Sequence, residues 1–157
     1  MDVLVIHASP NKDGLTAACA GAAAEGVRLA GGQATGVCLN DLRIGLCRAC
    51  GSGWGTCLAE HRCQQEDDFQ ALHARVLQAE AYVLVTPVYW GEMSETAKAF
   101  ADRLRRCEAT RDGASGLHGK PVVAVAAAGG SGRGTISCLA SMERWIQHVE
   151  ARVFDLL

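Results

Sequence analysis

Five short apolar runs alternate with four helix-like segments along the whole chain. The runs span 3–8, 33–39, 81–87, 121–128 and 152–157, and the helix-like segments span 16–30, 67–79, 94–107 and the residues after Gly134. The first run is rich in β-branched residues and lacks the apolar–polar alternation of a half-exposed strand, so we expect it to be covered on both faces. Regular alternation of strands and helices predicts an α/β fold with parallel strands joined by right-handed crossovers.

The composition indicates a single globular domain. The chain has 157 residues, of which 49% are hydrophobic and 20% charged, and a net charge of −2. This charge gives no electrostatic basis for binding nucleic acid or an anionic membrane. No apolar run approaches the roughly 18–20 residues of a membrane-spanning helix, and no basic segment precedes the first run as it would in a secretory signal. We therefore expect a cytoplasmic protein without nucleic-acid or membrane partners.

Three turns are expected to meet at one edge of the sheet. They span 9–16, 87–94 and 129–135, and they follow the first, third and fourth apolar runs. The carboxyl ends of parallel strands share one edge, and open α/β sheets bind their ligands there. The sequence therefore predicts a ligand site built from these three turns.

The first turn has the residue types of an anion site. It reads Ser-Pro-Asn-Lys-Asp-Gly-Leu-Thr from Ser9 to Thr16. Hydroxyl side chains, a glycine and the free N–H groups of a starting helix can bind a phosphate. The turn is neither a Walker A loop nor a GxGxxG loop. On this local sequence alone, a plain turn with a helix cap is the alternative.

Two further segments, together with the first turn, resemble a known family. They are Thr86-Pro-Val-Tyr-Trp-Gly91 and the following 93–103, which contains Lys-Ala-Phe-Ala-Asp-Arg. With Cys47-Arg-Ala-Cys50 after the second run and Asp67-Asp68 downstream, the chain resembles flavodoxin-like NAD(P)H-dependent FMN reductases and iron–sulfur flavoproteins over nearly its whole length. The resemblance implies a flavodoxin-like, doubly wound, five-stranded parallel sheet of order 2-1-3-4-5 over residues 1–157.

The same resemblance implies FMN as the cofactor and NAD(P)H as the electron donor. It places the phosphate at Ser9, Asn11, Gly14, Leu15 and Thr16, the isoalloxazine at Pro87, Val88, Tyr89, Trp90, Gly91 and Met93, and the pyrimidine edge at Gly129, Gly130 and Arg133. Aromatic faces can stack on a flavin, and glycines allow the backbone to approach it. Tyr89 and Trp90 as core aromatics, and Arg133 as a solvated surface charge, are the alternatives. Asn11-Lys12 stands where the family commonly has an arginine, so Lys12 is a candidate countercharge.

The chain ends at the fifth run, without the closing helix usual in flavodoxin-like folds. Such a sheet would expose apolar surface, and we expect a second subunit to cover it, giving a homodimer or a larger homo-oligomer such as a homotetramer.

Four of the eight cysteines fall in one loop at about 42–63. They are Cys47, Cys50, Cys57 and Cys63, and thiols at this density in a reducing compartment bind metal or carry out redox chemistry. In iron–sulfur flavoproteins a compact run of four cysteines binds a [4Fe–4S] cluster, but here Gly53 takes the third position and Cys57 falls in an insertion. The alternatives stay open: a cluster, a zinc ion, or no metal, with the cysteines as free thiols or with a labile Cys47–Cys50 disulfide. Because the loop follows the second run, we expect it to face the flavin.

These observations favour an FMN-dependent redox protein. As an enzyme it would be an NAD(P)H-dependent oxidoreductase that reduces a small acceptor such as a quinone, a flavin, or a nitro or azo compound. No side chain is assigned a catalytic role, because the flavin itself carries the chemistry. One alternative is an iron–sulfur flavoprotein that carries electrons to a protein acceptor, and another is a thiol or zinc redox sensor with a degenerate flavin site.

Overall fold

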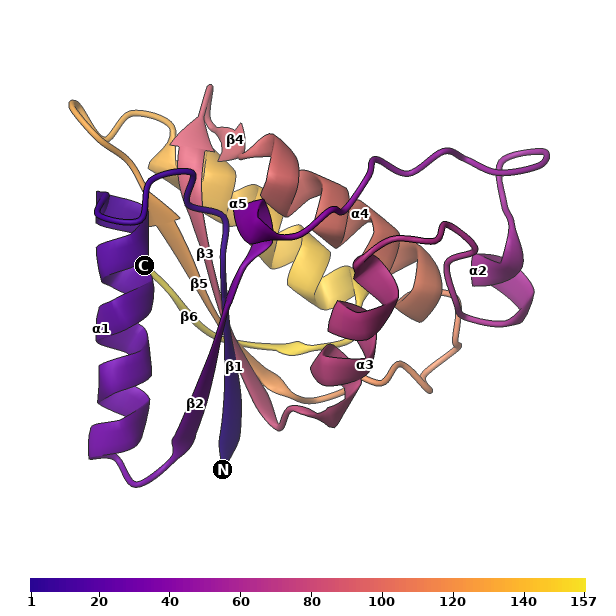
Figure 1. Ribbon diagram of the computed structural model, residues 1–157, viewed down its shortest axis with the longest axis horizontal. Helices are drawn as coiled ribbons and strands as arrows, with labels where there is room; N and C mark the ends of the chain where they lie inside the picture. Colours follow the sequence, from indigo (N-terminus) through magenta and orange to yellow (C-terminus); the bar gives the residue numbers. More distant parts are fainter.

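A twisted parallel sheet forms the centre of the computed structural model, which describes residues 1–157 (Figure 1). Its five parallel strands are β1 (Asp2–His7), β2 (Gln33–Cys38), β3 (Ala81–Tyr89), β5 (Pro121–Ala127) and β6 (Arg152–Leu156). They are arranged in the order β2-β1-β3-β5-β6. This confirms the predicted order, 2-1-3-4-5, because the fourth and fifth predicted strands are β5 and β6.

Three short elements were not predicted from the sequence. The two-residue strand β4 (Glu92–Met93) pairs antiparallel with the end of β3, and makes the sheet six-stranded. The 3-10 turn η1 (Leu39–Asp41) follows β2, and α2 (Thr56–Ala59) lies in the cysteine loop. Elements of two to four residues are too short to produce an apolar run or a helical period.

The helices cover the two faces of the sheet unequally. On one face lies α1 (Leu15–Leu29) alone, and on the other lie α3 (Phe69–Gln78), α4 (Glu95–Glu108) and α5 (Thr135–His148) (Figure 1). None of the helices has both the length and the apolar composition that spanning a membrane requires.

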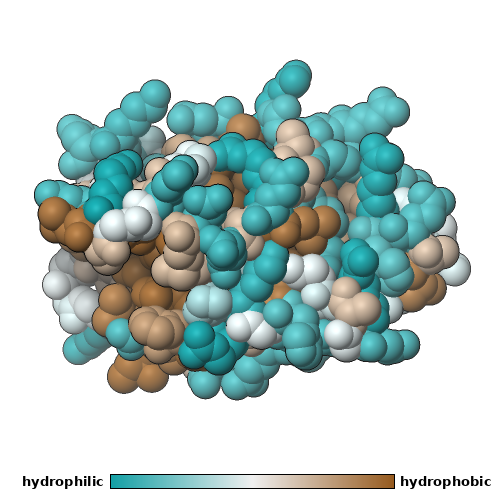
Figure 2. Space-filling model, turned by 90° about the horizontal axis from the view of Figure 1, so that it is seen from below, coloured by the Kyte–Doolittle hydropathy of each residue, from teal (hydrophilic) through white to brown (hydrophobic).

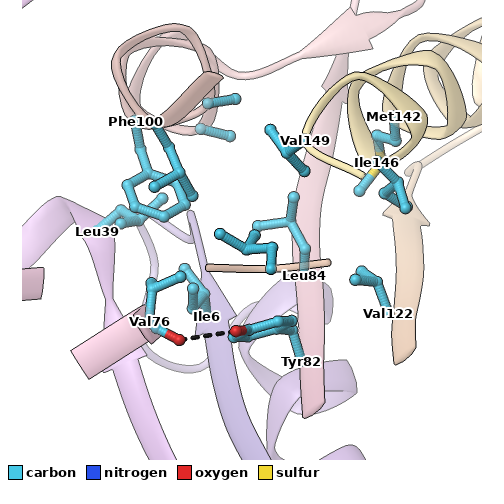
Figure 3. Close-up of a cluster of buried hydrophobic side chains, with 14 of the residues drawn as sticks. Ile6, Leu39, Val76, Tyr82, Leu84, Phe100, Val122, Met142, Ile146 and Val149 are labelled. Carbon is cyan, nitrogen blue, oxygen red and sulfur yellow. Dashed lines mark hydrogen bonds between the residues drawn. The ribbon is translucent and has the colours of Figure 1, made fainter. Parts of the chain in front are cut away.

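The larger core lies between the sheet and the three helices. Ile6 and Leu84 from the strands meet Phe100 from α4 and Ile146 from α5 there (Figure 3). The hydroxyl of Tyr82 donates to the carbonyl of Val76, at 2.7 Å, and so satisfies the polar end of this aromatic side chain. Alternate strand residues point to opposite faces, and the smaller core under α1 therefore contains Val3, Val5, Val83 and Val85 with Ala20 and Ala24.

The face that α1 shares is more open toward β5 and β6. Val123 and Val125 are only partly buried, and Phe154 of the edge strand is 66% exposed. Viewed from the amino ends of the strands, apolar side chains gather toward the side of α1, while the side of the cysteine loop is mainly hydrophilic (Figure 2). The exposed apolar surface expected from the sequence is therefore present, whereas the homo-oligomer stays a prediction.

Candidate functional site

Three loops meet at the carboxyl ends of the strands, as predicted, at the top of Figure 1. The first connects β1 to α1, the second connects β3 through β4 to α4, and the third connects β5 to α5. The second and third loops are in close contact, because a Cβ on Gly134 would lie 2.7 Å from Cα of Gly91. Both glycines also have positive φ, 89° and 81°. Any larger residue at Gly134 would therefore separate the two loops.

The first loop ends in a helix start whose N–H groups are free. Gly14 precedes α1 without a side-chain cap, and the N–H groups of Leu15, Thr16 and Ala17 have no acceptor. Such groups carry a partial positive charge at the end of the helix dipole and suit a phosphate. Ser9 is buried, and its hydroxyl donates to the carbonyl of Asn11, at 2.5 Å. Ser9 therefore folds the loop, and the helix start supplies the free donors.

The second loop presents two aromatic side chains at the edge of the sheet. Trp90 and Gly91 form a two-residue turn between Tyr89 and Glu92, and both central residues have positive φ. A left-handed conformation costs a non-glycine residue about 1–2 kcal/mol. Trp90 is fully exposed and Tyr89 is 39% exposed, so the alternative in which they are core aromatics is wrong.

Other residues predicted around the isoalloxazine lie deeper in the structure. Pro87 and Met93 are buried, and Met93 belongs to the larger core. Thr86, also buried, accepts a hydrogen bond from the N–H of Ser94, at 3.0 Å, while the hydroxyl of Ser94 accepts one from the N–H of Ala97 at the start of α4. These contacts fix the geometry of the turn rather than offering groups to a ligand.

The third loop contains glycines in the left-handed conformation and one positively charged side chain. Gly130 and Gly132 have positive φ, and Gly129 and Gly130 are exposed at the edge of the sheet. Arg133 is exposed, and its guanidinium takes part in no ion pair. The three loops together place free helix N–H groups, an aromatic turn and a glycine-rich segment at one edge of the sheet.

The four loop cysteines line a single small cavity. Cys47, Cys50, Cys57 and Cys63 surround a space of about 20 Å³. All four are free thiols, and only Cys57 is buried. No three His, Cys, Asp or Glu side chains lie close enough together to hold a metal ion. The chain therefore gathers the four sulfurs around one cavity without placing them in a ligating arrangement.

A buried arginine attaches the cysteine loop to α4. Arg103 is 1% exposed, and its Nη1 and Nη2 lie 2.5 Å and 3.0 Å from the two carboxylate oxygens of Asp67. Nη2 also lies 3.3 Å from Sγ of Cys63, and the guanidinium stacks 4.4 Å from the ring centre of Phe69. Burial alone would raise the pKa of Asp67, but hydrogen bonds from Arg103 and from the N–H groups of Gly45 and Phe69 outweigh it and lower the pKa.

The expectation that the cysteine loop faces the flavin loops is wrong. The loop leaves the edge of the sheet after η1 and runs along α4 to α2, at the far right of Figure 1. There the guanidinium of Arg106 stacks 3.8 Å from the ring centre of Trp54 and donates to the carbonyl of Gly53. Arg106 follows the helix cap Ser94 by twelve residues, which is about 18 Å along a helix. The physical reason is that the paired charges of Arg103 and Asp67 fix the loop to the second half of α4.

The sequence matches one family of known proteins over nearly its whole length. The model of the family described as NADPH-dependent FMN reductase matches residues 1–155. An iron-sulfur flavoprotein from Archaeoglobus fulgidus is 32% identical over 104 residues, which is 66% of this chain and 46% of that protein. A second iron-sulfur flavoprotein, from Methanosarcina thermophila, is 27% identical over 103 residues, or 66% of this chain and 52% of that protein. The chain thus spans about half the length of these relatives.

Solved structures confirm the flavodoxin-like α/β fold. RosB with bound 8-demethyl-8-formylriboflavin-5′-phosphate has a TM-score of 0.78 and 14% identity, and the match covers 98% of this chain and 61% of RosB. An NAD(P)H:quinone oxidoreductase from Methanothermobacter marburgensis has a TM-score of 0.69 and 19% identity, over 100% of this chain and 82% of that one. At these identities the likeness concerns the fold alone.

Proposed function

Because the chain belongs to the NADPH-dependent FMN reductase family, we propose that its three-loop edge binds FMN and transfers electrons from a nicotinamide nucleotide to a small acceptor. The observation that carries the proposal is the uncapped start of α1, where three consecutive N–H groups lack an acceptor. FMN has a phosphate dianion for this position. Bound FMN would supply the hydride and electron chemistry.

The chain's own residues would bind and orient the cofactor. The N–H groups of Leu15, Thr16 and Ala17 would hold the phosphate, and Lys12, which is exposed in the same loop, would add a positive charge. The exposed rings of Tyr89 and Trp90 would limit access of water to one side of the flavin. An acceptor that stacks on a flavin must be planar, so a quinone, a flavin or a nitroaromatic compound fits this edge.

FMN and riboflavin should bind with very different affinities. Riboflavin lacks the phosphate, and therefore leaves the free N–H groups of α1 without their ligand. We expect FMN to bind at least a hundredfold more tightly, which corresponds to roughly 3 kcal/mol. Titration of the flavin-free protein, followed by quenching of flavin fluorescence, measures both affinities. Equal affinities would overturn the assignment of the phosphate to this loop.

A second candidate function is that of an iron–sulfur electron carrier. It is favoured by the single cavity that the four loop cysteines share, and by the curated relatives named iron-sulfur flavoprotein. Cys47, Cys50, Cys57 and Cys63 offer the four thiolates that a [4Fe–4S] cluster or a structural zinc requires, but they would have to move to reach ligating positions. Purification without oxygen, followed by iron, sulfide and zinc analysis, distinguishes the cases. Absence of all three, with the four thiols open to alkylation, would leave a flavin reductase.

A further inference from the structure

A groove runs between α1 and β2, next to the proposed flavin site. It has a volume of about 360 Å³, and of the residues given a role in FMN binding above only Lys12 and Ala17 line it. Its two walls are α1 and the outermost parallel strand, which lie side by side in Figure 1. Small residues form most of its walls: Ala17, Ala20, Gly21 and Ala24 on α1 and Gly36 on β2, with Cys38 of β2 and Val5 of β1 beside them.

The two glycines of the groove are required neither by backbone conformation nor by packing. Neither Gly21 nor Gly36 has a positive φ, and a Cβ added at either position would meet no atom within 4 Å. A glycine inside a helix or strand costs about 0.5–1 kcal/mol relative to alanine. Because they have no side chains, these two glycines keep the space between α1 and β2 open.

Three polar side chains without partners stand at one end of the groove. Lys12 and Asp41 are both exposed, and neither takes part in an ion pair. His7 makes no side-chain hydrogen bond, and its Nδ1 is buried without a partner. Burial lowers the pKa of His7, although the nearby carboxylate of Asp41 acts in the opposite direction. Its ring is therefore neutral at pH 7, and one nitrogen can donate while the other accepts.

The shape and the charges of the groove together indicate its ligand. Flat aliphatic walls suit a planar ring, and ligand sites typically combine apolar walls with a few convergent polar groups. We propose that the groove between α1 and β2 is a second nucleotide site, in which a heterocyclic base lies between helix and strand, the phosphate meets Lys12, and a hydroxyl or amino group of the nucleotide donates to Asp41. Lys12 belongs to the loop that also starts the FMN site, so the two sites adjoin there.

Two kinds of nucleotide could supply a base for the groove and a phosphate for Lys12. One is the adenylate half of FAD, extending from the flavin loop into the groove, and the other is a separate nucleotide, such as the adenylate end of the nicotinamide donor.

Direct binding of AMP tests the groove independently of the flavin. It is measured by calorimetric titration of both the flavin-free and the FMN-loaded protein, with adenosine and inorganic phosphate as further probes.

Gly21→Leu and Gly26→Leu form a matched pair of variants. Both glycines lie on α1 with open space around them, but only Gly21 lines the groove. Leucine favours a helix over glycine, so both variants should fold, and circular dichroism checks this. We expect Gly21→Leu to weaken AMP binding at least tenfold and Gly26→Leu to leave it unchanged. Lys12→Ala should weaken binding of AMP but not of adenosine.

The outcomes separate this proposal from the FMN assignment. If FMN binds normally but AMP does not bind at millimolar concentration, or binds equally to Gly21→Leu and to the unaltered protein, the groove is not a nucleotide site. If AMP binds and FMN does not, the groove proposal stands alone. Saturation with FAD then identifies the occupant: FAD that excludes AMP fills the groove with its own adenylate, whereas AMP binding to the FAD-loaded protein indicates a separate nucleotide.

Discussion

Replacement of Thr16 by Asp should reduce FMN affinity about a thousandfold. Thr16 is 6% exposed in the first turn of α1, beside the free N–H groups. A carboxylate there would occupy these donors and repel the phosphate. Two unit charges about 4 Å apart repel by about 4 kcal/mol at an effective dielectric constant near 20, and each 1.4 kcal/mol is a factor of about ten in affinity. Fluorescence titration of the flavin-free variant measures the loss.

The controls for this variant separate charge from shape and from folding. Thr16→Asn has nearly the same shape as Thr16→Asp without its charge, and should retain most of the FMN affinity. Riboflavin carries no phosphate, so its affinity should change little in Thr16→Asp. An acidic residue in the first turn also favours the helix dipole, and the variant should remain folded. Binding of FMN by Thr16→Asp within tenfold of the unaltered protein would place the phosphate elsewhere.

Replacement of Asp67 by Ala should destabilise the protein by about 3–5 kcal/mol at pH 7. Removing one partner of a buried ion pair leaves the other charge buried and uncompensated, and here that charge is the guanidinium of Arg103, which is 1% exposed. The free energy of unfolding in urea measures the effect. Alkylation of Cys63, which contacts Arg103, should also become faster as the loop loosens.

The neighbouring aspartate provides the control. Asp68 pairs with Arg43, whose side chain is 92% exposed, and exposed pairs contribute about 1 kcal/mol or less. Because the pKa of Asp67 is lowered in the folded protein, its contribution is complete above the ordinary aspartate pKa and is lost as the pH falls through the lowered value. The difference between Asp67→Ala and the unaltered protein should therefore shrink in acid. Equal destabilisation by Asp68→Ala and Asp67→Ala would contradict this account.

The sheet could be predicted because each of its strands has a local signal. The run from Val3 to Ala8 and its four counterparts are apolar and short, and their spacing leaves room for one crossover helix each. Strand order followed from the family resemblance and was confirmed. The strand β4 could not be found in this way, because its two residues pair only once the turn at Trp90 and Gly91 has folded.

The course of the cysteine loop depends on contacts between residues far apart in the sequence. Asp67 and Arg103 are 36 positions apart, and Trp54 and Arg106 are 52 apart. Local spacing contains no information about such pairs. The available signals were Asp67-Asp68 and the Asp102-Arg103 of α4, which contribute to the family resemblance but do not by themselves indicate an ion pair between Asp67 and Arg103. The groove beside α1 gave no local signal either, since its walls are alanines and glycines of ordinary elements.

The two ends of α4 contact two separate parts of the molecule, the three-loop edge and the cysteine loop. The first turn is capped by Ser94 beside the three-loop edge, and the second half carries Arg103 and Arg106, which contact the cysteine loop. Sites that lie far apart and share no partners contribute independently to the free energy. Changes in the cysteine loop should therefore leave the affinity of the three-loop edge for the proposed flavin unchanged. For the same reason, the cysteine loop could be replaced by design without redesigning the three-loop edge.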